Sequence, residues 1–257
     1  MAETDPHKIY YRRFDWVFVV QHVILLVCVL ALIVSGVPLK FPEAHWAKLT
    51  IRLQGGMDAR RIIHHTAGLT LVALGVFHFL YYYLFNWRTP FYRRGLMPRP
   101  SDLMLIARHM GYIVGLRRDI PPMGRYTWFE KLDYIGLIWG ILVMGVTGMS
   151  MLFMEVALQF IPMAWLQVLW AAHSEEAMLA TLFLLVVHMY NVHFNPEKFP
   201  LSLTFLTGWI SHHEMEKYHA LELEQWKEHG LLDELRVPEA SHDPAQGTQT
   251  DRATQEP

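Results

Sequence analysis

Four long runs of apolar residues constrain this chain more than any other feature of its sequence. They lie at residues 17–36, 62–86, 134–154 and 173–194. Each reaches the roughly 20 residues that a helix needs to cross the hydrocarbon core of a bilayer. Backbone polar groups in lipid must be paired within the protein, and a helix pairs them along its own length. The sequence therefore predicts an all-α integral membrane protein, a four-helix bundle with interfacial helices.

The remaining residues are expected to flank this bundle. We expect a cytoplasmic N-terminal anchor at residues 1–16, a four-span domain at 17–194, a partly helical cytoplasmic extension at 195–237 and a disordered tail at 238–257. The first apolar run is too long for a removable signal peptide and lacks a small-residue cleavage site. We therefore expect it to remain as a membrane span.

The positions of lysine and arginine predict the orientation of the bundle. Residues 1–16, 87–133 and 195–257 hold 17 of the 22 basic residues, and the two other loops hold the remaining five. Cytoplasmic loops of membrane proteins carry the excess of these residues. Both termini and the long middle loop are therefore expected in the cytoplasm. The net charge of -2 gives no reason to expect a nucleic-acid partner, and the lipid bilayer is the expected surrounding.

Histidines lie inside three of the four runs, where ionisable side chains are rare and tend to be functional. In the fourth run, His173 and His188 are fifteen residues apart, which on a helix is roughly 22 Å along the axis and broadly the same side. This spacing suits two haem groups, one near each membrane face. The single cysteine, Cys28, excludes disulfides, cysteine-based zinc sites and covalently attached haem c within this chain. Any haem must be held by histidine.

Histidines in the other runs give each of these residues a candidate partner at the same depth. His64 lies at the outer edge with His173, and His22 lies at the inner depth of His188. His78 is an alternative to His22 as the partner of His188. A third haem is a further alternative. Two neutral imidazoles that face each other can supply both axial nitrogens of a low-spin haem iron. The sequence therefore predicts two haem b groups that carry electrons across the membrane.

Residues next to His64 are candidates for packing against the haem. Gly68 follows one turn later on the same face, where a missing side chain would let a flat macrocycle approach the backbone. Arg60 and Arg61 stand at the membrane edge and could pair with haem propionates or act as interfacial anchors. His65 lies about 100° around the helix from His64 and is expected to face elsewhere.

Four segments together resemble a known family. They are FDWVFVVQH at 14–22, RIIHHTAG at 61–68, GRYTWFEKLDY at 124–134 and HMYNVHFNPEKFP at 188–200. They look like the gamma subunit, a membrane cytochrome b, of respiratory formate dehydrogenases and the b-type cytochromes of nickel-iron hydrogenases. The resemblance covers roughly residues 10–220. It implies a four-helix dihaem quinone oxidoreductase subunit of the bacterial cytoplasmic membrane, in which His64 and His173 match the outer ligands and His22 and His188 the inner ones.

The resemblance also implies partners. An iron-sulfur or multihaem redox subunit would supply electrons on the outer face, and a quinone would bind beside the inner haem. Polar groups near His188 could line this pocket or relay protons: Tyr190, Asn191, His193, Glu130 and Asp133. Whether the chain counts as an enzyme depends on that assembly. Two features depart from the family pattern: His78 has no evident counterpart, and the histidine spacing in the fourth span is one residue longer.

Two other classes of protein are alternatives. A membrane di-iron desaturase or hydroxylase also uses many histidines, and His64/His65, His188/His193 and His212/His213 superficially resemble its clusters. Such an enzyme needs its histidines on one side of the bilayer, whereas these are predicted on both. The second alternative is a haem-free membrane anchor or transporter.

Overall fold

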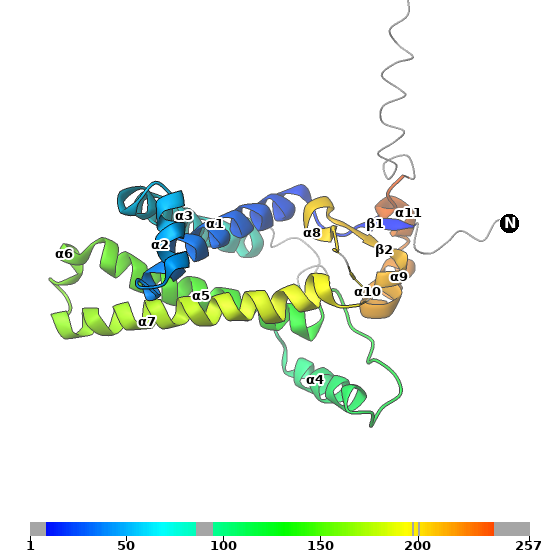
Figure 1. Cartoon of the computed structure of the whole chain (residues 1–257). Helices are drawn as coiled ribbons and strands as arrows, with labels where there is room; N and C mark the ends of the chain where they lie inside the picture. Colours follow the sequence, from blue (N-terminus) through cyan, green and yellow to red (C-terminus); the bar gives the residue numbers. More distant parts are fainter. Residues whose placement is uncertain (1–8, 86–94, 197, 200, 239–257) are drawn as a thin grey trace, which may run out of the picture. The chain divides into compact units, whose positions relative to one another are not determined.

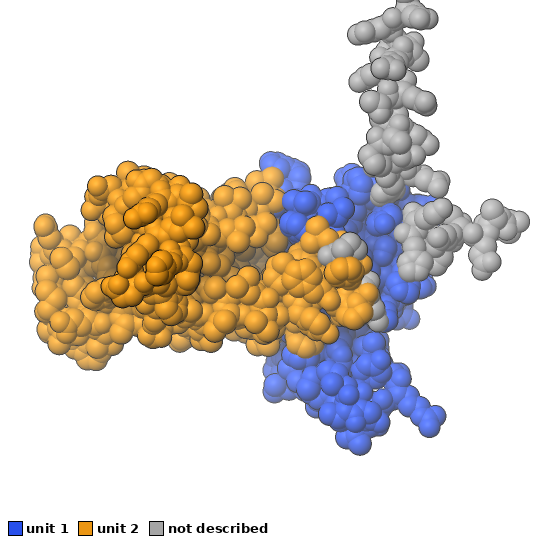
Figure 2. All heavy atoms as spheres, viewed as in Figure 1, with its two compact units in different colours: residues 1–19, 99–128, 203–257 blue, residues 20–98, 129–202 orange. Residues whose placement is uncertain are grey.

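The computed structural model describes residues 9–85, 95–196, 198–199 and 201–238. The chain divides into two compact units, each built from separate stretches of sequence (Figure 2). The first unit holds residues 1–19, 99–128 and 203–257, and the second holds residues 20–98 and 129–202. The predicted tail from residue 239 onward, and residues 1–8 of the predicted N-terminal anchor, lie outside the described residues.

Within the described residues, four helices are long and apolar enough to cross a membrane (Figure 1). These spans cover Trp16–Lys40, Met57–Leu84, Trp128–Leu152 and Met163–Phe194. Their main elements are α1 (Trp16–Lys40), α3 (Met57–Phe79), α5 (Trp128–Leu152) and α7 (Met163–Leu182). Many of their large apolar side chains are exposed, as expected where the outer surface of a helix faces lipid rather than water. The predicted all-α membrane fold is confirmed.

Two of the spans change to π-helical geometry toward one end. The segment η2 (Leu80–Phe85) continues α3, and η4 (Phe183–His188) and η5 (Tyr190–Phe194) continue α7. A π-helical turn closes i→i+5 hydrogen bonds and so holds one residue more than an α-helical turn. Such turns are frequent at functional sites. Here they carry two of the histidines singled out from the sequence, His188 and His193.

Short helices connect the spans. The helix α2 (His45–Leu53) lies between α1 and α3, and α6 (Met154–Ala157) precedes α7. On α2, the side chains of Trp46, Leu49 and Leu53 are exposed and share one face at helical spacing. An apolar face on a helix that also carries basic residues is the pattern of a helix lying in the membrane interface.

The first unit has a small core of its own, built on a two-stranded antiparallel sheet. The strand β1 (Tyr10–Arg12) pairs with β2 (Trp209–Ser211). Its helices are α4 (Pro100–Ile113), α8 (Thr204–Thr207), α9 (His212–Tyr218), α10 (Ala220–Glu228) and α11 (Leu232–Leu235). Its buried core consists of Tyr11, Ile210, Met215, Leu223 and Trp226. The strand pairing was not expected from the sequence, because it joins two three-residue segments near opposite ends of the chain.

A buried cluster of charges also holds the first unit together. Arg13 and Arg125 approach the carboxylate of Glu222 at 3.6 Å and 2.5 Å, and both guanidinium groups lie over the rings of Phe14 and Tyr126. Burial by itself would lower the pKa of Arg125, but the neighbouring Tyr126 and Glu222 raise this pKa overall. Buried charges need such partners. The cluster therefore ties together the N-terminal segment, the loop before α5 and α10.

A glycine is required where α8 ends. Gly208 has a left-handed backbone with φ of 73°, and its carbonyl accepts hydrogen bonds from the backbone N–H groups of Arg13 and Phe14 at 2.9 and 3.0 Å. A Cβ at this position would lie 2.7 Å from the carbonyl oxygen of Phe14. Only a residue without a side chain fits this approach of two backbones.

We therefore expect Gly208→Ala to destabilise the first unit by more than the roughly 1–2 kcal/mol that a left-handed backbone costs an ordinary residue. Gly230→Ala is the matched control, because Gly230 has φ of 65° with nothing within 4 Å of a built Cβ. It should show the backbone cost alone. Thermal unfolding of the detergent-solubilised protein, followed by tryptophan fluorescence, compares the two variants. If both variants were destabilised equally, the clash of a Cβ at residue 208 with the carbonyl oxygen of Phe14 would be contradicted.

Candidate haem site

His64 on α3 and His173 on α7 face each other within the second unit. Their ring centroids are 6.3 Å apart, and the ring planes are inclined at 66°. Two imidazoles that bind one metal ion from opposite sides, through metal–nitrogen bonds of about 2 Å, have ring centres roughly 6 Å apart. The separation of these rings therefore fits two axial ligands of one iron.

Each of these rings is held by a hydroxyl group on a neighbouring helix. The Nδ1 atom of His64 lies 2.9 Å from Ser35 Oγ on α1, and the Nδ1 atom of His173 lies 2.8 Å from Thr147 Oγ1 on α5. Both hydroxyls have a backbone carbonyl four residues earlier at 2.6 Å, to which they donate their own hydrogen. The hydroxyl oxygens can then only accept from the imidazoles. This assigns the proton to Nδ1 and leaves the lone pair of Nε2 for a metal.

Glycines beside these hydroxyls leave room for the rings. A Cβ at Gly36 would lie 3.1 Å from Cε1 of His64, and a Cβ at Gly148 would lie 3.1 Å from Cε1 of His173. Both distances are shorter than ordinary carbon contacts. By contrast, a Cβ at Gly68 would meet only Leu32, at an ordinary 3.8 Å. The close approach therefore involves Gly36 and Gly148, which sequence reasoning missed.

The two arginines near His64 differ in environment. Arg60 is buried and its Nη1 donates to the carbonyl of Ser35 at 3.2 Å, while its buried Nε has no hydrogen-bond partner among the described residues. Arg61 is exposed and pairs with Asp58 at 3.2 Å. An unpaired buried donor is costly, and a carboxylate such as a haem propionate would satisfy it. Of the two residues, Arg60 suits that role better.

The end of the bundle that holds His64 and His173 is also joined by an ion pair. Lys40, the last residue of α1, donates to the hydroxyl of Ser174 at 3.1 Å and pairs with the carboxylate of Glu175. Both partners directly follow His173 on α7. The contact therefore links α1 to α7 beside the facing histidines.

Toward the other end of this span, His188 has a carboxylate as its partner instead of a hydroxyl. Its Nδ1 lies 3.1 Å from Oδ2 of Asp133 on α5. An ionised carboxylate can only accept, so Nδ1 donates and Nε2 is again left available. His22 on α1 lies within electrostatic range of both His188 and His193, and His193 is buried. The structure thus gathers three histidines at this level of the second unit.

His78, the alternative inner residue, occupies a separate polar cluster. Its Nδ1 lies 3.0 Å from Gln21 Oε1 on α1, and its Nε2 lies 3.1 Å from the hydroxyl of Tyr134 on α5. The ring also stacks on Tyr82, and the hydroxyl of Tyr83 lies 3.5 Å from that of Tyr134. Both nitrogens of His78 therefore have protein partners.

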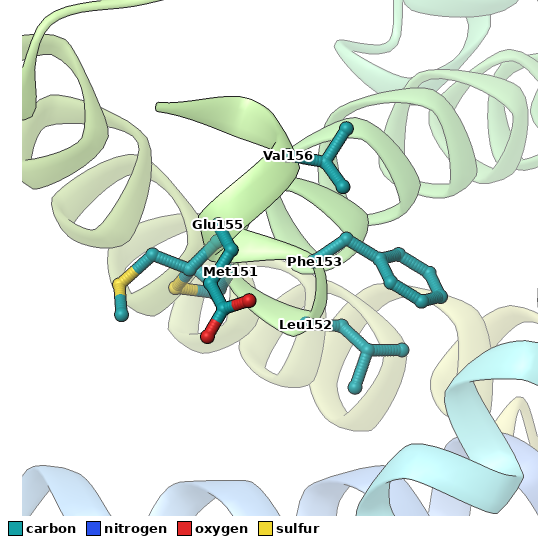
Figure 3. A pocket seen from close by; sticks show the side chains of 6 residues that line it. Met151, Leu152, Phe153, Glu155 and Val156 are labelled. Atoms are coloured by element: carbon teal, nitrogen blue, oxygen red, sulfur yellow. The ribbon is translucent and has the colours of Figure 1, made fainter. Parts of the chain in front are cut away.

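The polar residues suggested for a quinone pocket follow His188 along η5. Tyr190 is exposed, Asn191 is partly buried and His193 is buried. A hollow of about 320 Å³ lies elsewhere, at the turn between α5 and α6, lined by residues 151–156. Figure 3 shows Leu152 and Phe153 extending to the same side of this turn. None of the suggested quinone residues lines the hollow.

Comparison with known proteins identifies the family. The family model of prokaryotic cytochrome b561, which covers the b-type cytochromes of nickel-iron hydrogenases and formate dehydrogenases, matches residues 13–209. A search of curated proteins found no match. The matched region contains all four spans and every histidine of the candidate site. The family resemblance seen in the sequence is confirmed: this chain belongs to the prokaryotic cytochrome b561 family, as a multi-pass bacterial membrane protein and a b-type cytochrome of electron transfer.

Proposed function

We propose that the chain is the dihaem b subunit of a respiratory oxidoreductase complex in the bacterial cytoplasmic membrane. It carries electrons between a redox partner on the outer face and a quinone near the inner haem. His64 and His173 hold the outer haem, and His22 and His188 hold the inner one. The observation that carries the proposal is the pair of facing imidazoles, 6.3 Å apart, with both Nδ1 atoms bonded to hydroxyls.

The residues present fit haem b, which supplies reversible one-electron redox chemistry when it is bound. Ser35 and Thr147 orient the two outer imidazoles and fix their tautomers. Gly36 and Gly148 keep space open beside the rings. Arg60 offers a buried N–H donor for a propionate. These groups belong to separate helices, so the folded bundle holds the ligands ready before the cofactor binds.

The inner pair is proposed as His22 with His188. His22 lies near His188, and the Nε2 of His188 is left available by its bond to Asp133. His78 is the second candidate, because Gln21 bonds to its Nδ1 much as Asp133 bonds to that of His188. The hydroxyl of Tyr134 already occupies the Nε2 of His78. This favours His22, and it leaves His78 as a structural residue rather than a ligand of a third haem.

The proposed quinone and redox subunit belong to opposite ends of the four-span bundle. A quinone takes up two electrons and two protons, so its site needs polar groups within reach of the cytoplasm. Tyr190, Asn191 and His193 supply such groups beside His188, and the exposed face of Tyr190 is open to the lipid in which quinones dissolve. We propose an iron-sulfur or multihaem subunit of the same complex at the outer end, next to His64 and His173.

The di-iron alternative fits the described residues less well. A di-iron site needs a cluster of several histidine and carboxylate ligands. In the part of the chain that the structure describes, no group of three or more histidine, cysteine, aspartate or glutamate side chains is suited to a metal ion. Two-histidine haem ligation requires no such cluster.

Replacing either outer ligand tests the outer pair. We expect His64→Ala and His173→Ala each to lower the haem content of the purified protein from two haems per chain to one, because a single imidazole is left for the iron. The pyridine haemochrome spectrum measures this content. His65→Ala is the matched control from the same helical turn and should keep both haems. Retention of two haems by His64→Ala would contradict the assignment.

A second pair of variants decides the inner ligand. His22→Ala is expected to lose the inner haem and keep the outer one, whereas His78→Ala is expected to keep both, because its nitrogens bond to Gln21 and Tyr134. Haem content and the low-spin signal in electron paramagnetic resonance report the outcome. The reverse pattern would assign the ligand to His78 and overturn the proposed inner pair.

The orientation can be tested with a membrane-impermeant thiol reagent in a Cys28→Ala background. The positive-inside rule places the loop after α1 outside the cell and α10 in the cytoplasm. Glu43→Cys should therefore be labelled in intact spheroplasts, and Glu228→Cys only after the membrane is opened; both glutamates are exposed. Labelling of Glu228→Cys in sealed spheroplasts would contradict the predicted topology and place α10 outside the cell.

A further inference from the structure

The three candidate ligands with assigned tautomers do not have equivalent partners. Neutral hydroxyls hold His64 and His173, whereas the carboxylate of Asp133 holds His188. All three partners accept from Nδ1–H. The difference lies in charge, because only the inner ligand is bonded to an anion.

Within the described residues, the carboxylate of Asp133 has its hydrogen bond with His188. Its side chain is mostly buried, and its Oδ1 has no hydrogen-bond partner among the described residues. The bond from His188 Nδ1 to Oδ2 is therefore not weakened by competing donors in the described part of the chain. A partly buried carboxylate is screened less by solvent than an exposed one.

The helix register supports a specific pairing rather than a chance contact. On α5, Asp133 and Thr147 are fourteen residues apart, about four helical turns, so they share a face. Their partners His188 and His173 are fifteen residues apart on the neighbouring span. The π-helical segment η4, which ends at His188, absorbs the extra residue. Both histidines can then meet their partners on one face of α5.

We propose that Asp133 is a positioning residue that lowers the reduction potential of the inner haem relative to the same site without the charge. This proposal rests on the proposed function, in which His188 is an axial ligand. A carboxylate that accepts from Nδ1–H makes the imidazole a stronger electron donor. A nearby negative charge also favours the more positively charged, oxidised iron. The hydroxyls of Ser35 and Thr147 provide only the orientation.

The test is a redox titration of the purified complex, followed at the haem α bands. Asp133→Asn keeps the size of the side chain and an oxygen that accepts from Nδ1–H, but it removes the charge. We expect it to retain two haems per chain and to raise one of the two midpoint potentials while the other stays unchanged. Glu155→Gln, the control, removes an exposed carboxylate just beyond the opposite end of α5 from Asp133 and should change neither potential.

Two results would overturn the proposal: unchanged midpoint potentials in Asp133→Asn with both haems present, or an equal shift of the same potential in Glu155→Gln. If Asp133→Asn loses the inner haem, Asp133→Glu restores the charge. Recovery of the haem in that variant supports the proposal, and its loss in both variants counts against it. Failure of the proposed function is seen separately, because His188→Ala would then keep both haems.

Discussion

Hydrogen bonds to the Nδ1 atoms of histidines between the spans are the interactions on which the site depends. An imidazole N–H without a partner in such a place would cost about 1–3 kcal/mol. Ser35 and Thr147 satisfy two of these groups, and both hydroxyls give their own hydrogen to a carbonyl of the same helix. The direction of each bond is therefore fixed, and so is the nitrogen left for a metal. In this way a serine and a threonine determine the tautomers of the neighbouring histidines.

The surroundings of His64 and His173 are built from the same parts. The pair α1 and α3 provides a hydroxyl, a glycine directly after it and a histidine, and α5 and α7 provide the same set. The members are Ser35, Gly36 and His64 in the first pair and Thr147, Gly148 and His173 in the second. Around His78 and His188 the two pairs of helices repeat less closely, because Gln21 bonds to His78 where Asp133 bonds to His188. The two pairs of helices thus supply matching partners to His64 and His173 and contrasting partners to His78 and His188.

The sequence predicts the four spans for a physical reason, and it singles out His64 and His173, whose ring centroids the structure places 6.3 Å apart. Runs of uncharged residues longer than 20 have few structures other than a membrane helix, and His64 and His173 fall at matching depths in two of them. The hydroxyls and glycines that hold these rings could not be distinguished, because small residues on a membrane helix usually serve helix packing. The dipeptides Ser35-Gly36 and Thr147-Gly148 were the available signal.

Other features needed coordinates. The spacing of fifteen residues between His173 and His188 departed from the family pattern in the sequence, and the π-helical turn of η4 gives it a physical explanation. The strand pairing of β1 with β2 joins segments too short and too distant for any periodicity to predict. The choice between His22 and His78 depends on hydrogen bonds of individual ring nitrogens, which sequence depth alone does not fix.

The most direct test of this account is the haem content and optical spectrum of the purified wild-type protein. Two haem b groups per chain, with the sharp α band of bis-histidine ligation in the reduced-minus-oxidised spectrum, are the predicted result. A colourless protein, or one that binds a single haem b per chain when fully loaded, would contradict it.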